Sequence, residues 1–267
     1  MALKTDALYF KSFSSGSSGN CCFLGRKGAG ILIDAGVGVR SIKAALEAEG
    51  LGFEDVCAVL ITHEHSDHIR SLGSFCKRLR KPVWMSATQI CSAPARWFGG
   101  DLLASSARTL PESGPAEILP GRIYATPFAV PHDARETLGY FIQFDGLNFV
   151  IMTDIGRMTQ EALGYASISE TVVIEANYDP DMLRDGPYPK ELQDRIRGGN
   201  GHLSNGECAL AVKSFRHEGL RNVFLCHLSA HNNTPELARK AVAEALNGSG
   251  ARLQVLPRTS PSPLFEL

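Results

Sequence analysis

The sequence predicts an α/β protein in which a two-layered β core is flanked by helices, organised as one domain over residues 1–267. Short runs rich in β-branched and aromatic residues recur along the chain, as is typical of buried strands. Segments with apolar residues at helical spacing lie between them. Each of two broad halves begins with strands and acquires helices later, an order that favours two packed β layers with helices outside.

The composition is that of an ordinary globular protein. Apolar residues make up 44% of the chain and charged residues 21%, so a sizeable core can form without disulfides or a structural metal. The formal net charge of -1 argues against attraction of the whole surface to nucleic acid, although a local basic patch is compatible with it. Scattered cysteines without a C-x-x-C pair, no signal-peptide pattern and no membrane-length apolar stretch predict a cytoplasmic protein without membrane segments.

The individual elements follow from periodicity and from turn residues. In the first half, strands are expected at residues 8–13, 20–25, 30–36 and 56–61, and helices at 39–49 and 69–79. In the second half, strands are expected at 122–133, 137–146, 147–156, 171–179 and 222–229, and helices within 179–197 and at 205–217 and 235–245. Asp145-Gly146 predicts a tight hairpin turn. Residues 83–120 are rich in Gly and Pro and are expected to be partly loop.

The segment THEHSDH at residues 62–68 places three histidines and two acids directly after an expected strand. On a loop at the end of that strand, His63 and His65 can turn toward one point and Asp67 and His68 toward another. This geometry suits two metal ions, and mixed imidazole and carboxylate ligands favour zinc, manganese or iron over magnesium or calcium. The alternatives are a solvated polar loop or a single structural zinc.

Three further candidate ligands, His132, Asp154 and His227, each stand at or just beyond the carboxyl end of an apolar run. Open sheets place their sites at such ends. A single histidine there is more often a hydrogen-bonded surface residue. The repetition of the same placement favours a shared site.

These residues and several longer motifs resemble the metallo-β-lactamase superfamily and, within it, the YycJ/WalJ group of DNA exonucleases. The motifs that carry the resemblance are SSGSSGN at 14–20, LIDAG at 32–36, THEHSDH, LGY at 138–140, TDIG at 153–156, DMLRDGPYP at 181–189, GHLSN at 201–205 and HLSAHNNTPELA at 227–238.

The resemblance implies a four-layer αββα sandwich and a metal-dependent phosphodiesterase, most specifically a 5′-to-3′ DNA exonuclease with a metal-bridging hydroxide as its nucleophile. It assigns seven residues to two divalent metal ions. They are His63, His65 and His132 for one ion, Asp67, His68 and His227 for the other, and Asp154 as a bridge. Asp67 is also a candidate to orient the attacking water.

His202 in GHLSN precedes an expected helix start, where Ser204 or Asn205 can cap the helix and free N–H groups can meet an anion. In phosphodiesterases similar to ribonuclease Z, a histidine in such a motif binds the phosphate or protonates the leaving oxygen. The resemblance therefore makes His202 catalytic, with Glu175 as a candidate to orient it. A capping-loop histidine and a surface acid are the alternatives.

Substrate contacts are expected from small and polar residues near these motifs. Ser17 and Asn20 lie in a turn whose backbone can approach a phosphate closely, and Ser204 and Asn205 lie beside His202. Two basic groups could line a nucleic-acid track, although a solvated helix face is the commoner explanation. They are Arg70, Lys77, Arg78, Arg80 and Lys81, and Arg184, Lys190, Arg195 and Arg197. No aromatic platform for stacking bases is evident.

Two positions depart from the pattern of the group. Tyr178 stands where a histidine is expected, and Ala230-His231 stands where acids usually follow HLS. Two other functions stay open at this stage. One is a carboxylic ester, thioester or lactone hydrolase on the same dinuclear site, and the other is a non-catalytic metal-binding scaffold. The basic residues beside GHLSN count against the first, since a carbonyl substrate needs no phosphate cradle.

Overall fold

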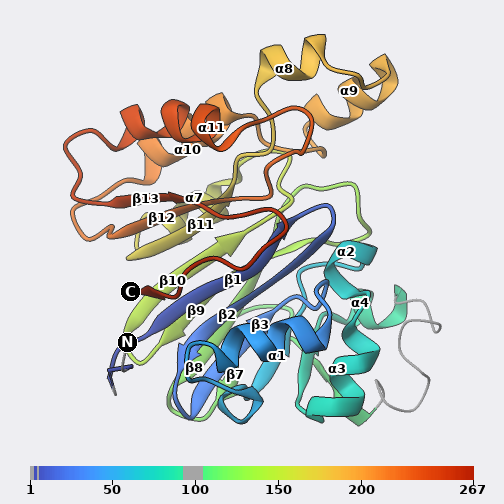
Figure 1. The fold of residues 1–267 in the computed structure, drawn as a ribbon, viewed down its shortest axis with the longest axis vertical. Helices are drawn as coiled ribbons and strands as arrows, with labels where there is room; N and C mark the ends of the chain where they lie inside the picture. The colour runs from blue at the N-terminus through green and yellow to red at the C-terminus, as the bar shows by residue number, and fades with distance from the viewer. Residues whose placement is uncertain (1–2, 5, 93–104) are drawn as a thin grey trace.

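The computed structural model describes residues 3–4, 6–92 and 105–267. Two seven-stranded mixed sheets pack face to face, and helices cover the outer face of each (Figure 1). The expected four-layer αββα sandwich is confirmed.

The first sheet has the order β14-β1-β2-β3-β4-β5-β6. Its strands are β1 (Tyr9–Gly16), β2 (Gly19–Arg26), β3 (Ala29–Ile33), β4 (Ala58–Leu60), β5 (Val83–Met85), β6 (Ala107–Thr109) and β14 (Phe265–Glu266). The helices of this half are α1 (Val39–Glu47), α2 (Ser66–Ile69), α3 (Leu72–Leu79) and α4 (Ala87–Ser92). Apolar residues of α1 and α3, such as Ile42 and Phe75, pack with Phe23 and Leu32 of the sheet because their helices are amphipathic.

The second sheet has the order β13-β12-β11-β10-β9-β8-β7. Its strands are β7 (Ala116–Leu119), β8 (Ile123–Ala129), β9 (Leu138–Phe144), β10 (Leu147–Met152), β11 (Thr171–Glu175), β12 (Asn222–Cys226) and β13 (Arg252–Val255). The helices α7 (Gln160–Ala166), α10 (Asn205–Phe215) and α11 (Pro235–Ala243) contribute buried residues to the core on its outer face. Two more helices, α8 (Pro180–Asp185) and α9 (Lys190–Arg197), project beyond the sheets in Figure 1.

A continuous core joins the two sheets. Phe10 of β1 contacts Phe149 of β10 and Phe224 of β12, with ring centroids 5.5 Å and 4.8 Å apart. The fully buried Tyr140 donates its hydroxyl hydrogen to the carbonyl of Ile61, at the end of the segment that leads into THEHSDH. The sandwich core thereby helps to fix the position of the THEHSDH segment.

Most expected elements are present, with shifted ends. The Asp145-Gly146 hairpin is confirmed: both residues have positive φ, 47° and 88°, and Phe144 pairs with Leu147. The expected helix at 69–79 is instead two helices, because α2 ends at Ile69 and α3 begins at Leu72. Within 83–120, which was expected to be partly loop, the structure has β5, α4, β6 and β7, and residues 93–104 of that stretch lie outside the described part. Across the described residues, no helix has the length and apolar character that a membrane span requires.

Candidate metal centre and catalytic cleft

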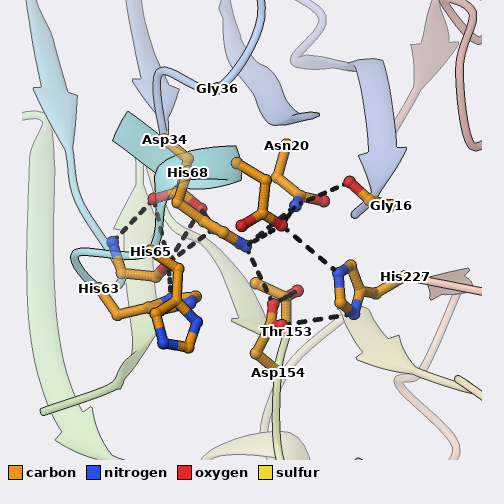
Figure 2. Close-up of polar contacts among 12 residues, drawn as sticks. Gly16, Asn20, Asp34, Gly36, His63, His65, His68, Thr153, Asp154 and His227 are labelled. Atoms are coloured by element: carbon orange, nitrogen blue, oxygen red, sulfur yellow. Dashed lines mark hydrogen bonds and ion pairs between the residues drawn. The ribbon is translucent and has the colours of Figure 1, made fainter. Parts of the chain in front are cut away.

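Strand ends position the seven candidate metal ligands. His63 and His65 lie in the segment between β4 and α2, while Asp67 and His68 belong to α2 itself rather than to a loop as expected. His132 follows β8, Asp154 follows β10 and His227 follows β12. Figure 2 shows the side chains from the two sheets pointing toward one another.

The ligand atoms converge within coordination range of common points. Three groups, each with ligand atoms within 4.8 Å of one another, contain these residues: His63, His65 and His132; His63, His68 and Asp154; and Asp67, His68 and His227. Asp154 lies centrally, with carboxylate oxygens 3.2 Å from His68 Nε2, 3.7 Å from His132 Nε2 and 3.4 Å from His227 Nδ1. The structure thus brings all seven candidate ligands together, with the Asp154 carboxylate between His68, His132 and His227.

Hydrogen bonds on the far side of three imidazoles fix their orientation. His68 Nδ1 lies 2.8 Å from Asp34 Oδ2, and His227 Nδ1 lies 2.8 Å from Glu175 Oε1. His132 donates from Nδ1 to the carbonyl of Gly201 at 3.0 Å. Such contacts hold the tautomer and leave the other ring nitrogen for a metal ion.

The donor set fits a divalent cation. His63 Nε2 and His227 Nε2 are buried and have no hydrogen-bond partner, and buried polar atoms of that kind are rare unless something binds them. The His63 and His68 rings stand with centroids only 4.0 Å apart. Imidazole nitrogen with carboxylate oxygen is a ligand combination that suits zinc, manganese or iron.

The buried histidines and carboxylates of the site shift the pKa values of one another. Burial opposes protonation of His68, but Asp34 and Asp154 outweigh it and raise the pKa of His68 to about 10. Burial likewise opposes ionisation of Asp154, yet His227 and His68 hold its pKa well below the usual value. His63 differs, because burial and the neighbouring His68 lower its pKa well below the usual value. The carboxylates therefore create a negative potential at the site. A metal cation can neutralise it in place of the protons.

Three residues of the site have left-handed backbone conformations. Asp34, Asp154 and His227, with φ of 63°, 53° and 55°, each follow the end of a strand. Non-glycine residues rarely adopt this region, and such residues cluster at functional sites. The turn redirects each side chain from the sheet face toward the cluster. Sequence reasoning assigned no role to Asp34, although LIDAG was among the motifs of the resemblance.

Gly36 permits α2 to sit against the end of β3. A Cβ atom at Gly36 would lie 1.5 Å from the carbonyl oxygen of Asp67, so no other residue fits without movement of the backbone. The Gly36 N–H donates to the carbonyl of Asn20 at 2.9 Å, and Arg70 Nε donates to the carbonyl of Gly36 at 2.6 Å. This close approach places Asp67 and His68 within the cluster.

His202 and Glu175 form a second unit beside the metal ligands. His202 Nδ1 lies 2.8 Å from Oε1 of the fully buried Glu175, the same oxygen that contacts His227. Glu175 Oε2 accepts hydrogen bonds from the N–H groups of Ile155 and Leu203. Burial opposes the charge on His202, but Glu175 outweighs it and raises the pKa of His202. The pair that the sequence suggested is therefore formed.

A cleft opens beside this unit. His202, His227 and Ser17 line it, together with residues of α9 and of the segment before it, among them Tyr188 and Arg195. Ser17 is exposed there, as a substrate contact requires.

The other three expected substrate contacts are buried and engaged elsewhere. Asn20 donates to Asp67 Oδ2 at 3.0 Å and so positions a metal ligand. Ser204 caps α10 through the N–H of Glu207, as its sequence position suggested. Asn205 exchanges side-chain hydrogen bonds with Asn233. These hydrogen bonds hold Asn20 against Asp67, Ser204 at the start of α10 and Asn205 against Asn233.

The departures from the group's pattern also have positions. Tyr178 is 4% exposed and packs with Leu183 and Ile196, and burial raises the pKa of its phenol to about 12. It is therefore a core residue rather than a surface that meets substrate. His231 is exposed, and its ring lies 5.9 Å from that of Tyr188.

Comparison with known proteins places this architecture in a class. A model of the beta-lactamase superfamily domain matches residues 30–228. Zn²⁺-bound PqqB from Methylobacterium extorquens shares the fold with a TM-score of 0.72 and 17% identity, over 95% of this chain and 99% of that one. The chain belongs to the metallo-β-lactamase superfamily, and it is a metal-dependent hydrolase.

The more similar relatives narrow the position within the superfamily to the YycJ/WalJ group. The chain is 31% identical to exodeoxyribonuclease YycJ of Bacillus anthracis over 91% of this chain and 90% of the relative. It is 33% identical to exodeoxyribonuclease WalJ of Streptococcus pneumoniae serotype 2 (strain D39) over 97% of both chains.

Proposed function

We propose that this protein is an exodeoxyribonuclease of the cytoplasm that removes nucleotides from the 5′ end of DNA with two divalent metal ions, zinc, manganese or iron. The observation that carries the proposal is the His202–Glu175 pair: Glu175 is buried and holds both His202 and His227, and these two histidines line the same cleft. The names of the YycJ and WalJ relatives support a DNA substrate. The free state of every cysteine outside residues 93–104 accords with a reducing compartment.

The seven ligands have distinct roles in this proposal. His63, His65 and His132 would hold one metal ion and Asp67, His68 and His227 the other, with Asp154 between them. Bound divalent cations lower the pKa of water and neutralise the charge of a phosphodiester. The Asp67 carboxylate, held by Asn20, can orient the attacking water by accepting its hydrogen bond.

His202 supplies the proton that the leaving oxygen needs. Glu175 holds His202 Nδ1, so Nε2 is the ring nitrogen left to meet substrate. Because Glu175 raises the pKa of His202, the imidazole carries a proton at a higher pH than a free histidine does. A protonated Nε2 can donate to a phosphate oxygen or to the departing 3′ oxygen.

The test is hydrolysis of end-labelled DNA by the manganese-loaded protein. Single- and double-stranded DNA with a 5′ phosphate should lose 5′ nucleotides stepwise, while RNA of equal sequence is degraded more slowly. His202→Ala should lower kcat about 100-fold or more, the usual range for removing a general acid, with bound metal unchanged. His217→Ala is the matched control. His217 follows α10, contacts the carbonyl of Ser169 and does not line the cleft.

Each outcome separates the candidate functions. Intact DNA with manganese, zinc and iron, together with turnover of a carboxylic ester or thioester, would replace the nuclease by the other hydrolase class. Internal cuts in a circular single strand would replace exonuclease by endonuclease action. Equal activity of His202→Ala and the wild-type protein would remove His202 from the mechanism.

A further inference from the structure

The helices α8 and α9 form a small unit beside the cleft with an apolar cluster of its own. Tyr178, Leu183 and Ile196 are buried in it, and Tyr188 and Leu192 pack against them while remaining partly exposed. Figure 1 shows the two helices standing apart from the layers of the sandwich. The unit lies in the sequence between Asp154 and His202, so it is anchored at both ends beside the site.

One side of this unit lines the catalytic cleft with apolar surface. Tyr188, Leu192 and Ile196 line the same cleft as His202 and His227. Leu192 and Ile196 are one helical turn apart on α9, so they present a common face. A partly exposed ring and two aliphatic side chains offer nothing to a phosphate or a metal ion. They offer a flat surface to the face of a nucleobase, which stacks on aromatic side chains regardless of its identity.

Arg195 adds a cation to the same wall. Its guanidinium forms an ion pair with Asp133, the residue after His132, and Asp133 Oδ1 lies 3.2 Å from His132 Nε2. The Arg195 side chain is 64% exposed, so its ion pair with Asp133 is weakly held in water. A guanidinium can bind two phosphate oxygens with the same forked geometry that it uses to bind the two oxygens of a carboxylate.

The other basic residues of the unit are engaged away from the cleft. Arg184 pairs with Asp181 and Asp185, and Lys190 and Arg197 both pair with Asp194. Arg195 thus differs from its neighbours, because it pairs with Asp133, which lines the cleft and contacts His132.

We propose that the α8–α9 unit is the nucleotide-binding wall of the cleft: a base next to the scissile phosphate stacks on Tyr188, and Arg195 exchanges Asp133 for a backbone phosphate. The inference rests on the proposed nuclease function and names how that site holds its substrate. It predicts weak base selectivity, because stacking and a phosphate contact read no base edge.

The first test changes the substrate and leaves the protein intact. Two DNA strands lacking either the first or the second base from the 5′ end are compared with the complete strand. One of them should show a KM about ten-fold higher or more, the scale of one lost stacking contact. A strand that lacks a base near its middle, far from the 5′ end, serves as the reference.

Variants of Tyr188 and Arg195 then show which residue causes the difference in KM. In Tyr188→Leu the complete and base-free strands should become equivalent substrates, whereas Tyr188→Phe, which keeps the ring, should keep the difference between them. Arg195→Ala should raise KM for both strands and reduce the dependence of KM on salt concentration, since one phosphate contact is lost. Lys213→Ala, which removes an exposed cation of α10 that does not line the cleft, is the matched control and should leave both quantities unchanged.

A merely structural role for Tyr188 would show differently. It would lower activity on complete and base-free strands by the same factor and lower the melting temperature, and that result would overturn the proposal. Equal KM for all strands with the wild-type protein would overturn it as well. If the protein cleaves no DNA strand but does hydrolyse an ester, the result contradicts the proposed nuclease function. It then also contradicts this inference, which depends on that function.

Discussion

Asp34 determines how His68 presents its Nε2 atom to the site. Its carboxylate accepts hydrogen bonds from the N–H and hydroxyl of Thr62 as well as contacting His68, so it joins β3 to the start of the metal-ligand segment. We expect Asp34→Asn to weaken metal affinity about 10- to 100-fold, because a neutral amide holds the imidazole less firmly. Competition for zinc with a chromophoric chelator measures this directly.

Asp55→Asn provides the control for that variant. Asp55 is equally buried, but its carboxylate accepts from the N–H groups of Gly28 and Gly52. Its loss should lower thermal stability and leave zinc affinity as it was. Unchanged zinc affinity in Asp34→Asn would show that His68 keeps its orientation without the carboxylate.

The contrast between these residues shows what a sequence can reveal at this scale. The seven ligand candidates could be nominated because H-x-H-x-D-H is a dense local pattern and the others repeat one placement after strands. Asp34 was not nominated, although it follows a strand as Asp154 does and lies in the LIDAG motif, because its role depends on His68, a residue 34 positions away. Tertiary packing imposes the left-handed φ of Asp34, Asp154 and His227, so no pattern of residues predicted it.

At the scale of elements, α2 depends on a contact that only glycine allows. Gly36→Ala would drive a methyl group into the carbonyl of Asp67, so α2 must shift away from β3. We expect a loss of about 1–3 kcal/mol or more in the free energy of unfolding, as for an overpacked core. Metal content should fall too, because Asp67 and His68 move with the helix. Thermal melting and metal analysis of the purified variant check both.

Gly38→Ala is the matched control two residues away. A Cβ atom there meets nothing within 4 Å, and the φ of -63° is ordinary for any residue. The change should cost under about 1 kcal/mol, the scale of an altered helix cap, and leave the metal content intact. A stable, fully metallated Gly36→Ala protein would show that the contact is less rigid than the structure indicates.

Elements were predictable where they are long and periodic. The hairpin of β9 and β10 and the helices α1, α10 and α11 were anticipated because their apolar spacing and turn residues agree. The strands β5 and β6, each three residues long, lie amid Gly and Pro and were not anticipated. They pair in parallel with neighbours far along the chain, so the sheet rather than local propensity defines them.

For the whole molecule, a metal ion bound by the candidate ligands would join the two halves of the sandwich. Asp34 and the THEHSDH ligands come from the first sheet, and His132, Asp154 and His227 come from the second. A cation that binds only the folded chain should therefore stabilise both halves together. At a zinc concentration 100 times the Kd, the gain is about 2.7 kcal/mol, or roughly 5–11 °C in Tm for a chain of this size.

Calorimetry with and without a chelator measures this shift. The transition should stay single in both conditions, because each half of the site lies on a different sheet of one core. In His63→Ala the zinc-dependent part of the shift should shrink markedly. Two separate transitions after chelation, or an unchanged Tm, would mean that the halves do not share the metal.

The left-handed turns at Asp34, Asp154 and His227 make the site a property of the backbone as much as of its side chains. Each such turn costs on the order of 1 kcal/mol. A glycine would relieve this cost, but it could supply neither the candidate metal-binding side chains of Asp154 and His227 nor the Asp34 carboxylate that holds His68. The metal-free chain thus carries a stability–activity trade-off at three places. A designer who grafts these ligands onto another scaffold must copy the strained turns too, because regular strand ends would aim the same side chains elsewhere.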